Sequence, residues 1–317
     1  MQGTGGGGHS ATRDAGRPRP AVVLPLDLTP GHLLRRAQQV HTALWLAEFD
    51  REVTGPQFAL LLAMTQNGPL DQNSVGQLVS LDKSTAADVI VRLQKYGWLD
   101  RTRDPSDARR NLLTLTRAAR TAVRHLTAGV VAVQQRLVEP IAPARRHWFV
   151  EKLALLAYAG QVPAPRAARP AGERAEIAVP LRLEGAPGHL IRRAEQLHGS
   201  HWLTRVGPRL TPSQYGLLSA IASQHLLDQR DAGDRASLDK SSTSDIVGRL
   251  TRRGLIGREG DERDRRRKLL YLTDEAWQLM EEVEPAVRAV QAALVQPLPE
   301  DDAAELTELL RNVAYRR

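Results

Sequence analysis

The chain has 317 residues, of which 42% are hydrophobic and 25% are charged, and its formal net charge is +8. This excess of cations favours a polyanionic partner such as nucleic acid. The absence of cysteine excludes disulfides, thiol catalysis and cysteine-ligated zinc. No apolar run approaches the roughly 18 residues of a membrane span, and the N-terminal stretch lacks an apolar signal core. We therefore expect a cytoplasmic protein with no membrane partner.

The most informative feature of the chain is an internal repeat. Residues 31–116 align with residues 188–273 at a constant offset of 157, with 37 identities in 86 pairs. The stretch GHLLRRAQQVHTALWL returns as GHLIRRAEQLHGSHWL, and SLDKSTAADVIVRL returns as SLDKSSTSDIVGRL. Two copies are too few for a solenoid. The repeat therefore predicts a dimer fused into one polypeptide.

Composition and repeat together divide the chain into four parts. The Gly-rich segment 1–24 has no apolar periodicity, and we expect it to be a disordered tail. Copy one is expected to fold over 25–159 and copy two over 181–317. The intervening residues 160–180 contain four prolines and no helical pattern, which predicts a semi-extended linker.

Each copy begins with two helical patterns. Apolar side chains recur at helical spacing from Leu33 to Trp45 and again from Leu190 to Trp202, which predicts a first helix in each copy. The next helix has a clear start signal in copy one, where Thr54 is followed three positions later by Gln57. This spacing is typical of a capping box, and the same pair recurs in copy two.

A pair of helices separated by a tight turn follows. The pattern predicts a short helix near Gln72–Leu78 and a second helix over Lys83–Tyr96, with Asp82 as N-cap and Gly97 as the stop. A helix, a short turn and a second helix form the helix-turn-helix arrangement. The aligned segment of copy two has the same order.

A hairpin and two further helices complete each copy. The stretches WLDRTRD and RRNLLTLT flank a polar tip at 104–107, and LIGREG and RRKLLYLT flank another at 261–264. Two short strands around a turn-prone tip predict a hairpin. Thr116 and Thr273 are placed to cap a long helix, which Pro140 and Pro297 should end, and a last helix follows.

Copy two departs from copy one in the first helix of the pair. It has Ala232 and Arg235 where copy one has Val75 and Leu78. An arginine at an inward position packs poorly, so we expect the copy-two helix pair to be looser or re-oriented. As a hypothesis, copy two then binds DNA more weakly and the operator need not be a symmetric palindrome.

The second helix of the pair is the predicted DNA reader, because N-terminal residues of such a helix reach base edges in the major groove. Ser and Thr bond phosphates or bases, and Lys or Arg can read guanine. A solvated helix face has the same composition, but Asp-Lys-Ser recurs in both copies, which favours DNA. The predicted contacts are Lys83, Ser84, Thr85, Asp88 and Arg92 in copy one, and Lys240, Ser241, Ser242, Asp245 and Arg249 in copy two.

The hairpins carry a second group of cations. Arg planes suit phosphates and the narrow minor groove, although the acidic residues at each tip also fit a hairpin that is simply soluble. The candidates are Arg101, Arg103, Arg109 and Arg110 in copy one, and Arg265, Arg266 and Arg267 in copy two.

Taken together, GPLDQNSVGQLVSLDKST, RLQKYGWLDR and DPSDARRNLLTLT resemble the MarR family of winged-helix transcriptional regulators. The resemblance covers nearly all of both copies. It implies a mainly α fold with small β-wings: two tandem winged helix-turn-helix domains that form a pseudo-two-fold dimer within one chain. Members are normally homodimers, so one chain is expected to be the functional unit. The wing arginine of the family's Asp-x-Arg motif falls on Arg109 and Arg266.

The resemblance also implies an effector site, because members commonly bind phenolic or aromatic acids between the dimerisation helices and the winged domain. GHLLRRAQQVH resembles members that sense aromatic acids or their CoA thioesters. The four-residue spacing of His41 and Trp45 puts both on one helix face, and a nearby Arg could hold a carboxylate. A packed interface would show the same pattern. The candidates are Arg35, Arg36, His41 and Trp45, and Arg192, Arg193, His198 and Trp202.

No phosphate-binding loop, zinc-protease motif or Ser-His-Asp signature is present, and the nine histidines do not cluster at metal spacing. We therefore expect no enzyme activity and no cofactor. The expected function is that of a DNA-binding regulator, of repressor type, which binds a pseudo-palindromic operator in double-stranded DNA and is released by a small aromatic acid or CoA thioester. The alternative is an architectural or protein-interaction module that binds DNA non-specifically, which strong salt dependence without sequence discrimination would favour.

Overall fold

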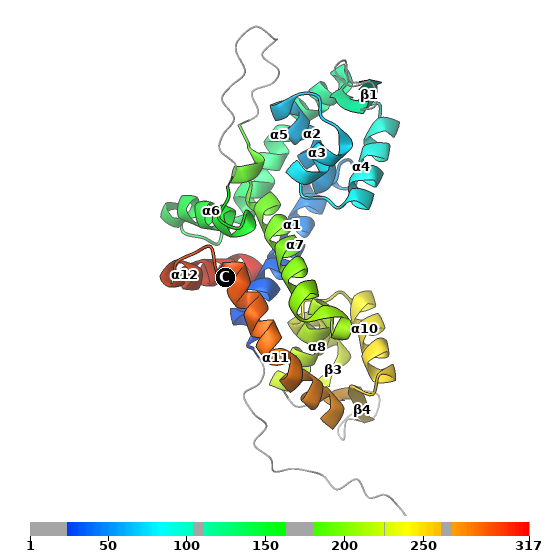
Figure 1. Ribbon diagram of the computed structural model, residues 1–317, viewed down its shortest axis with the longest axis vertical. Coiled ribbons are helices and arrows are strands. Elements are labelled where there is room, and N and C mark those ends of the chain that lie inside the picture. The colour runs from blue at the N-terminus through cyan, green and yellow to red at the C-terminus, as the bar shows by residue number, and fades with distance from the viewer. Residues whose placement is uncertain (1–23, 104–110, 163–179, 225, 261–267, 317) are drawn as a thin grey trace, which may run out of the picture.

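The computed structural model describes residues 24–103, 111–162, 180–224, 226–260 and 268–316. Two lobes lie at the ends of an elongated molecule, and long helices at a waist join them (Figure 1). Each lobe contains the helix-turn-helix and hairpin of one copy. Within the described ranges no helix is long and apolar enough to cross a membrane.

Copy one has the element order that its sequence predicts. Its elements are the 3₁₀ turn η1 (Leu26–Leu28), α1 (Pro30–Phe49), α2 (Gly55–Asn67), α3 (Gln72–Leu78), α4 (Lys83–Lys95), β1 (Leu99–Arg103), β2 (Asn111–Leu115), α5 (Arg117–Leu137) and α6 (Pro143–Ala157). The strands form an antiparallel pair in which Leu99 lies opposite Leu115 and Arg103 opposite Asn111. The predicted mainly helical fold with a small hairpin is confirmed.

Copy two repeats this order with small additions. Its elements are η2 (Leu183–Gly185), α7 (Pro187–Arg205), η3 (Gly207–Arg209), α8 (Pro212–Ser223), β3 (Leu227–Asp228), α9 (Gln229–Arg235), α10 (Lys240–Arg252), β4 (Ile256–Gly260), β5 (Lys268–Leu272), α11 (Asp274–Val295) and α12 (Glu300–Tyr315). Strand β3 pairs with β5 and was not predicted. In copy one the corresponding pairing is a single bridge between Leu70 and Leu113.

The helix boundaries follow from local capping. Thr54 and Gln57 form a reciprocal capping box at the start of α2, and Thr211 and Gln214 do the same for α8. Each pair satisfies two backbone N–H groups that the first turn of a helix leaves without partners. At the other end of α4, Gly97 has a φ of +68°, a conformation that glycine adopts without steric cost. The predicted start and stop signals of these helices are confirmed.

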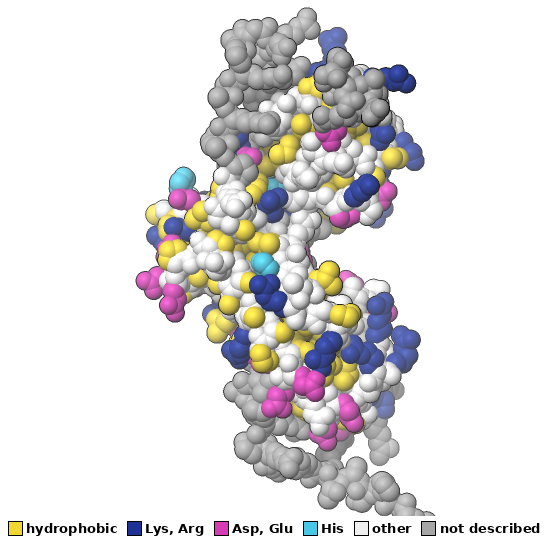
Figure 2. Space-filling view, in the orientation of Figure 1, with side chains coloured by type: hydrophobic (Ala, Val, Ile, Leu, Met, Phe, Trp, Pro, Cys, Tyr) yellow, Lys and Arg dark blue, Asp and Glu magenta, His cyan; other side chains and the backbone are white. Residues whose placement is uncertain are grey.

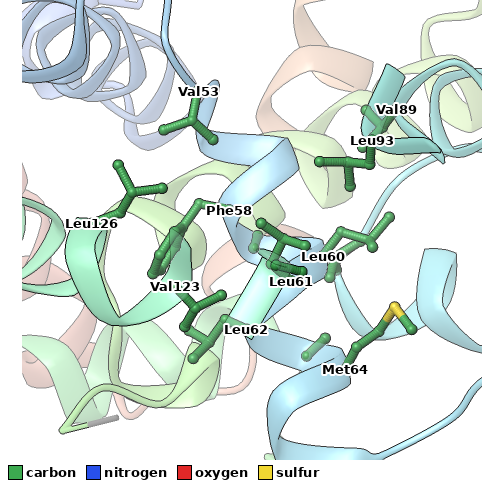
Figure 3. Packing of buried hydrophobic residues seen from close by; sticks show 14 of the residues in the cluster. Val53, Phe58, Leu60, Leu61, Leu62, Met64, Val89, Leu93, Val123 and Leu126 are labelled. Atoms are coloured by element: carbon green, nitrogen blue, oxygen red, sulfur yellow. The ribbon is translucent and has the colours of Figure 1, made fainter. Parts of the chain in front are cut away.

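Each lobe has its own apolar core. In copy one Phe58 of α2 packs with Leu126 of α5 and Ile90 of α4, and all three side chains are nearly fully buried. Figure 3 shows Phe58 between α5 residues and the rest of α2. The core also contains Leu183, which belongs to the second copy. Reciprocally, Leu24 packs against the core of copy two. The segments that precede α1 and α7, which we call the N-terminal arms, are therefore exchanged between the two copies.

The waist has a third core, which both copies build. Helix α1 packs against α12 and crosses α7, and α7 packs against α6. Leu33 and Phe149 from copy one lie in one cluster with Leu190 and Leu310 from copy two, and none of the four has measurable exposure. Burial of this much apolar surface from both copies makes the pair a single folded unit. The predicted fused dimer is confirmed.

The expectation that Arg235 packs poorly is wrong. Its side chain is exposed, and its guanidinium donates a hydrogen bond to Gln224 Oε1 at 2.6 Å. The inward position of α9 belongs to Ala232, which is fully buried. A Cβ on Gly233 would lie 2.4 Å from Thr243 Oγ1, so the glycine permits the close crossing of α9 and α10. The copy-two helix pair is packed, and Arg235 gives no reason to expect it to be looser.

Candidate functional site

The two predicted reading helices face the same side of the molecule. Helix α4 lies in one lobe and α10 in the other, and both are on the flank opposite α6 and α12 (Figure 1). Lys and Arg side chains gather along this flank in Figure 2. All of the predicted copy-one contacts that the structure describes are exposed: Lys83, Ser84, Thr85, Asp88, Arg92, Arg101 and Arg103.

The N-terminus of α4 is organised by Asp82. Its carboxylate accepts the backbone N–H groups of Ser84 and Thr85 at 3.0 and 2.9 Å and their hydroxyls at 2.6 and 2.5 Å. The hydroxyl bonds from Ser84 and then Thr85 hold the pKa of Asp82 well below its usual range. The cap therefore fixes two of the predicted contact residues at the start of the helix.

The copy-two face is similar but carries an internal ion pair. Lys240, Ser241, Asp245 and Arg249 are exposed, and Ser242 is half-buried. Arg249 Nη2 lies 2.7 Å from Asp245 Oδ2, and its Nε donates to Oδ1 at 3.2 Å. A fork held by a carboxylate in this way is oriented before any partner arrives. Arg109, Arg110, Arg265, Arg266 and Arg267 lie outside the described residues.

A cavity of about 320 Å³ opens between α1, α2 and α5 of copy one and the N-terminal arm of copy two. Its apolar lining includes Trp45, Phe58 and Leu62, and Leu181 and Leu183 complete it from the second copy. The indole of Trp45 is fixed because its Nε1 donates to the carbonyl oxygen of Val53 at 2.7 Å. A concave apolar site with a few polar groups is typical of a small-molecule pocket.

The polar end of this cavity contains two buried atoms without a hydrogen-bond partner, Gln38 Oε1 and His189 Nε2. Arg192 Nη2 lies 3.1 Å from His189 Nδ1, and since a guanidinium can only donate, Nδ1 accepts and the neutral ring carries its proton on Nε2. Both atoms are sealed from solvent, but the residues that carry them line the cavity. Leaving such groups unpaired costs stability, so a ligand able to bond both is favoured.

Arg192 links the cavity to the helix-turn-helix. Its guanidinium lines the cavity and donates to the carbonyl oxygens of Val79 and Ser80 at 2.7 and 3.1 Å. Both residues lie in the turn between α3 and α4. Neighbouring Arg193 donates to the carbonyl oxygen of Ala157 at 3.0 Å and to the hydroxyl of Ser80. The turn of copy one is therefore held by a helix of copy two.

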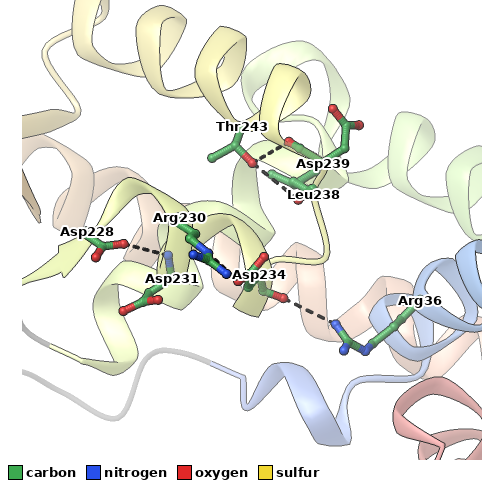
Figure 4. Close-up of polar contacts among 8 residues, drawn as sticks. All are labelled: Arg36, Asp228, Arg230, Asp231, Asp234, Leu238, Asp239 and Thr243. Carbon is green, nitrogen blue, oxygen red and sulfur yellow. Dashed lines mark hydrogen bonds and ion pairs between the residues drawn. The ribbon is translucent and has the colours of Figure 1, made fainter.

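The equivalent contacts, related by the pseudo-two-fold axis, hold the turn of copy two. Arg36 donates to the carbonyl oxygens of Ala314 at 3.0 Å and Asp234 at 3.3 Å and to Ser237 Oγ at 2.9 Å. Figure 4 shows the Arg36 side chain reaching from α1 to Asp234 at the end of α9. Arg35 donates to the carbonyl oxygen of Ala236 and to Ser213 Oγ, the latter at 2.9 Å.

Comparison with known proteins agrees with this architecture. Two sequence models of the MarR family match the chain, at residues 53–110 and 210–267. FarR, a helix-turn-helix transcriptional regulator of Neisseria gonorrhoeae, is 30% identical over 105 residues, which are 33% of this chain and 72% of FarR. The chain belongs to the MarR family. It is therefore a transcriptional regulator of the MarR type.

Two other MarR-type proteins are similar to parts of the chain. NicR, a transcriptional repressor of Pseudomonas putida, is 34% identical over 100 residues, and the match spans 29% of this chain and 63% of NicR. The regulator PcaV from Streptomyces coelicolor, in its crystal structure with its natural ligand, has 37% sequence identity to this chain. The match spans 44% of this chain and 98% of PcaV, with a TM-score of 0.42.

The structure separates the predicted effector residues into two groups. His41, Trp45 and Arg192 line the cavity, whereas Arg35, Arg36 and Arg193 contact the opposite helix-turn-helix. His198 and Trp202 are buried at the aligned place in copy two. Gln38, Gln134 and His189 were not predicted. Gln38 and Gln134 carry no motif, but His189 repeats His32 in the GHL stretch of each copy, and that recurrence could have indicated it.

The same contact joins each first helix to the long helix of the opposite copy. The backbone N–H of Gly188 donates to Gln134 Oε1 at 2.8 Å, and Gln134 Nε2 lies 3.4 Å from His41 Nε2. Burial, and secondarily the charge of Arg192, lowers the pKa of His41 to about 4. The imidazole is therefore neutral at pH 7 and can accept the amide proton. The described residues contain no cluster of three side chains able to hold a metal ion.

Proposed function

We propose that this MarR-type regulator is a repressor that binds a pseudo-palindromic operator as a single chain and leaves DNA when an aromatic carboxylic acid enters the cavity of copy one. The observation that carries the proposal is the double role of Arg192, which lines the cavity and also bonds Val79 and Ser80. A ligand carboxylate competes for the same guanidinium protons. Its binding therefore removes contacts that position α4.

The lining supports this ligand class. Trp45, Phe58 and Leu62 provide a flat apolar surface for a ring, and Arg192 remains protonated at neutral pH, since burial lowers its pKa only to about 10. His189 Nε2 supplies a second donor for the carboxylate, and Gln38 Oε1 can accept a ring hydroxyl. The volume of about 320 Å³ is at the small end for ligand pockets, which favours a free aromatic acid over a complete CoA thioester.

The DNA contact is proposed for the exposed faces of α4 and α10 together with the hairpins. One chain then presents two reading helices, and each N-terminus carries Lys and Ser next to its Asp cap. Such a pair suits two half-sites on one face of a duplex. The cations of the faces neutralise phosphates, and the residues at the helix starts read base edges.

Fluorescence anisotropy of the full chain on its own upstream DNA and on a scrambled duplex, at two salt concentrations, tests the proposal. We expect tight, sequence-selective binding by one chain per site, and release on addition of 4-hydroxybenzoate or a related aromatic acid. Equal and salt-sensitive binding to both duplexes would contradict the proposal and support the architectural alternative.

A further inference from the structure

The two copies present different side chains at the place of the effector cavity. At the offset of 157, Gln38, Pro56, Phe58, Ala59 and Leu62 of the cavity lining correspond to Glu195, Ser213, Tyr215, Gly216 and Ser219. These five positions change from apolar or neutral to polar, charged or smaller, whereas the lining residue Asp50 corresponds to Gly207. The surrounding architecture is shared, so these side chains decide what each crevice accepts.

Arg35 of α1 extends to the copy-two crevice and forms a hydrogen bond with α8. Its Nη1 donates to Ser213 Oγ at 2.9 Å on α8. A Cβ at Gly216 would lie 3.2 Å from Arg35 Nη2, so the glycine provides the room that the guanidinium occupies. Copy one has Ala59 and Pro56 at these positions. Proline has no hydroxyl to accept from Arg192, and the methyl group of Ala59 lines open space instead.

A second polar contact joins α8 to α11, and it involves Tyr215, which stands at the position of the lining residue Phe58. The hydroxyl of Tyr215 donates to Glu284 Oε2 at 2.7 Å, and Glu284 Oε1 lies 2.8 Å from Arg288 Nη2. The Glu284 side chain is 9% exposed, and burial is the first cause that raises the pKa of Tyr215. Phe58 stands at the Tyr215 position of copy one and cannot form this bond. The contact ties the ring of Tyr215 to α11.

The charge of the two crevices also differs. Copy one has the neutral Gln38 where copy two has Glu195, whose pKa is raised by burial against the opposing charge of Arg35. At another lining position copy one has the carboxylate of Asp50 and copy two has Gly207. A carboxylate ligand in the copy-two crevice would face Glu195 and a guanidinium already engaged by Ser213 and Ala236. Like charges in a partly buried site repel strongly.

The paired histidines show the same divergence. His32 of copy one reaches the copy-two turn, where its Nε2 lies 3.3 Å from Ser237 Oγ, so both ring nitrogens have partners. The equivalent residue His189 of copy two lines the copy-one cavity, and its Nε2 has no partner. The His32 ring thus contacts the copy-two helix-turn-helix through Ser237, whereas His189 Nε2 has no partner in the protein.

We propose that each chain binds one anionic aromatic effector, in copy one alone, and that the copy-two crevice is a fixed polar latch. The effector then displaces only the contacts of Arg192 with the copy-one turn. The contacts of Arg35 and Arg36 with the copy-two turn persist in the effector complex. The inference rests on the proposed function, because it takes the copy-one cavity as the effector site.

The two sites can be observed separately through their tryptophans. Trp45 borders the copy-one cavity and Trp202 is its counterpart. In the full chain labelled with 5-fluorotryptophan, with resonances assigned by Trp→Phe substitution, 4-hydroxybenzoate should shift the Trp45 resonance saturably and leave that of Trp202 in place. Titration calorimetry should give one ligand per chain. Saturable shifts of both resonances with similar affinity, or two ligands per chain, would overturn the inference.

Xenon, which enters apolar cavities without needing a charge partner, separates the inference from the proposed effector class. A xenon shift confined to Trp45, with no response to aromatic acids, would support the unequal crevices and contradict the proposed ligand. Xenon shifts at both tryptophans would overturn the latch. A response to neither probe would contradict the cavity, and with it both the proposed function and the inference.

Exchange of the differing side chains provides the reciprocal test. The combined variant Glu195→Gln, Ser213→Pro, Tyr215→Phe and Ser219→Leu should open the second crevice, so that the stoichiometry rises from one to two and Trp202 responds. The single variant Gln38→Glu is a milder change in copy one. It should weaken 4-hydroxybenzoate binding about tenfold or more while changing the binding of neutral phenol much less. Equal losses for acid and phenol, or a folded combined variant with one site, would overturn the inference.

Discussion

Arg192 of α7 donates a hydrogen bond to the carbonyl oxygen of Val79 at 2.7 Å, and these two residues belong to different copies of the repeat. The contact joins the dimerisation helix of copy two directly to the helix-turn-helix of copy one. In a homodimer the same contact would depend on protein concentration. Here both ends are on one polypeptide, so the turn is held at any dilution.

Replacement of Arg192 by alanine should lower the free energy of unfolding by about 2 kcal/mol, because hydrogen bonds from a charged donor to Val79 and Ser80 are lost in a largely buried site. Urea denaturation measures this. The matched control is Arg205→Ala on the exposed end of the same helix, which should change stability by less than about 0.5 kcal/mol. Equal effects of the two substitutions would show that the turn contacts carry no stability.

Substitution of Gly188 by alanine should destabilise the protein by about 1–3 kcal/mol, because the added Cβ would lie 2.2 Å from His41 Nε2 and the ring must move. Gly199→Ala on the same helix is the control. No atom lies within 4 Å of a Cβ at that position, so alanine should stabilise the helix by up to about 1 kcal/mol. Thermal unfolding of both variants checks the opposite signs.

Four buried histidines predict acid sensitivity. Burial is the main cause that lowers the pKa of His32 and His189 to about 3 and of His41 and His198 to about 4. Because these values are below the 6.5 of an unfolded chain, the unfolded state binds more protons between pH 6.5 and about 4. The stabilisation is complete above pH 6.5 and falls as the pH decreases, by about 1.4 kcal/mol per pH unit for each ring.

Urea denaturation at pH 7.5, 6 and 5 measures this slope. His41→Gln should reduce it by the share of one ring, while His147→Gln, whose side chain is 94% exposed, should leave it unchanged. A stability that does not vary over this range would contradict the neutral, buried state of the rings.

Charge removal on α4 should weaken DNA binding without changing which sequence is preferred if the side chain contacts phosphate. For Lys83→Ala and Arg92→Ala we expect the slope of log affinity against log salt to fall by about one unit per contact. Arg146→Ala on α6, at the waist and away from this flank (Figure 1), should retain the slope of the parent chain. A loss of sequence preference instead would assign the residue to base readout.

The helix pattern of this protein could be predicted because its signals are local. Thr54, Asp82 and Thr116 cap the helices that follow them, and a cap depends only on residues within one turn. The arm exchange could not be predicted. Periodicity shows that Leu183 is buried but does not show whether it packs against its own copy or the other one.

The site was predicted only in part for a related reason. An arginine on a helix face suits a ligand carboxylate and a backbone carbonyl equally well, and every residue of a neighbouring turn offers a carbonyl. Arg36 and Arg193 donate to backbone carbonyl oxygens. Arg192 also donates to carbonyl oxygens, but it lines the cavity in which a ligand carboxylate would bind. The difference between the crevices was visible in the aligned repeat, at Gln38 and Glu195, but its meaning depends on which side chains surround them.

The packing of α1 against α12 has a consequence for synthesis. Helix α6 ends at Ala157 and α12 ends at Tyr315, so copy one leaves the ribosome 158 residues before its last packing partner is made. At 5–20 residues per second this interval lasts roughly 8–32 s. During this time the apolar face of α1 with Leu33 and Leu34 lacks α12, although α7 is made earlier. The nascent chain therefore has to be kept from aggregating until translation ends. The subunits of an ordinary dimer instead associate after each has been released from the ribosome.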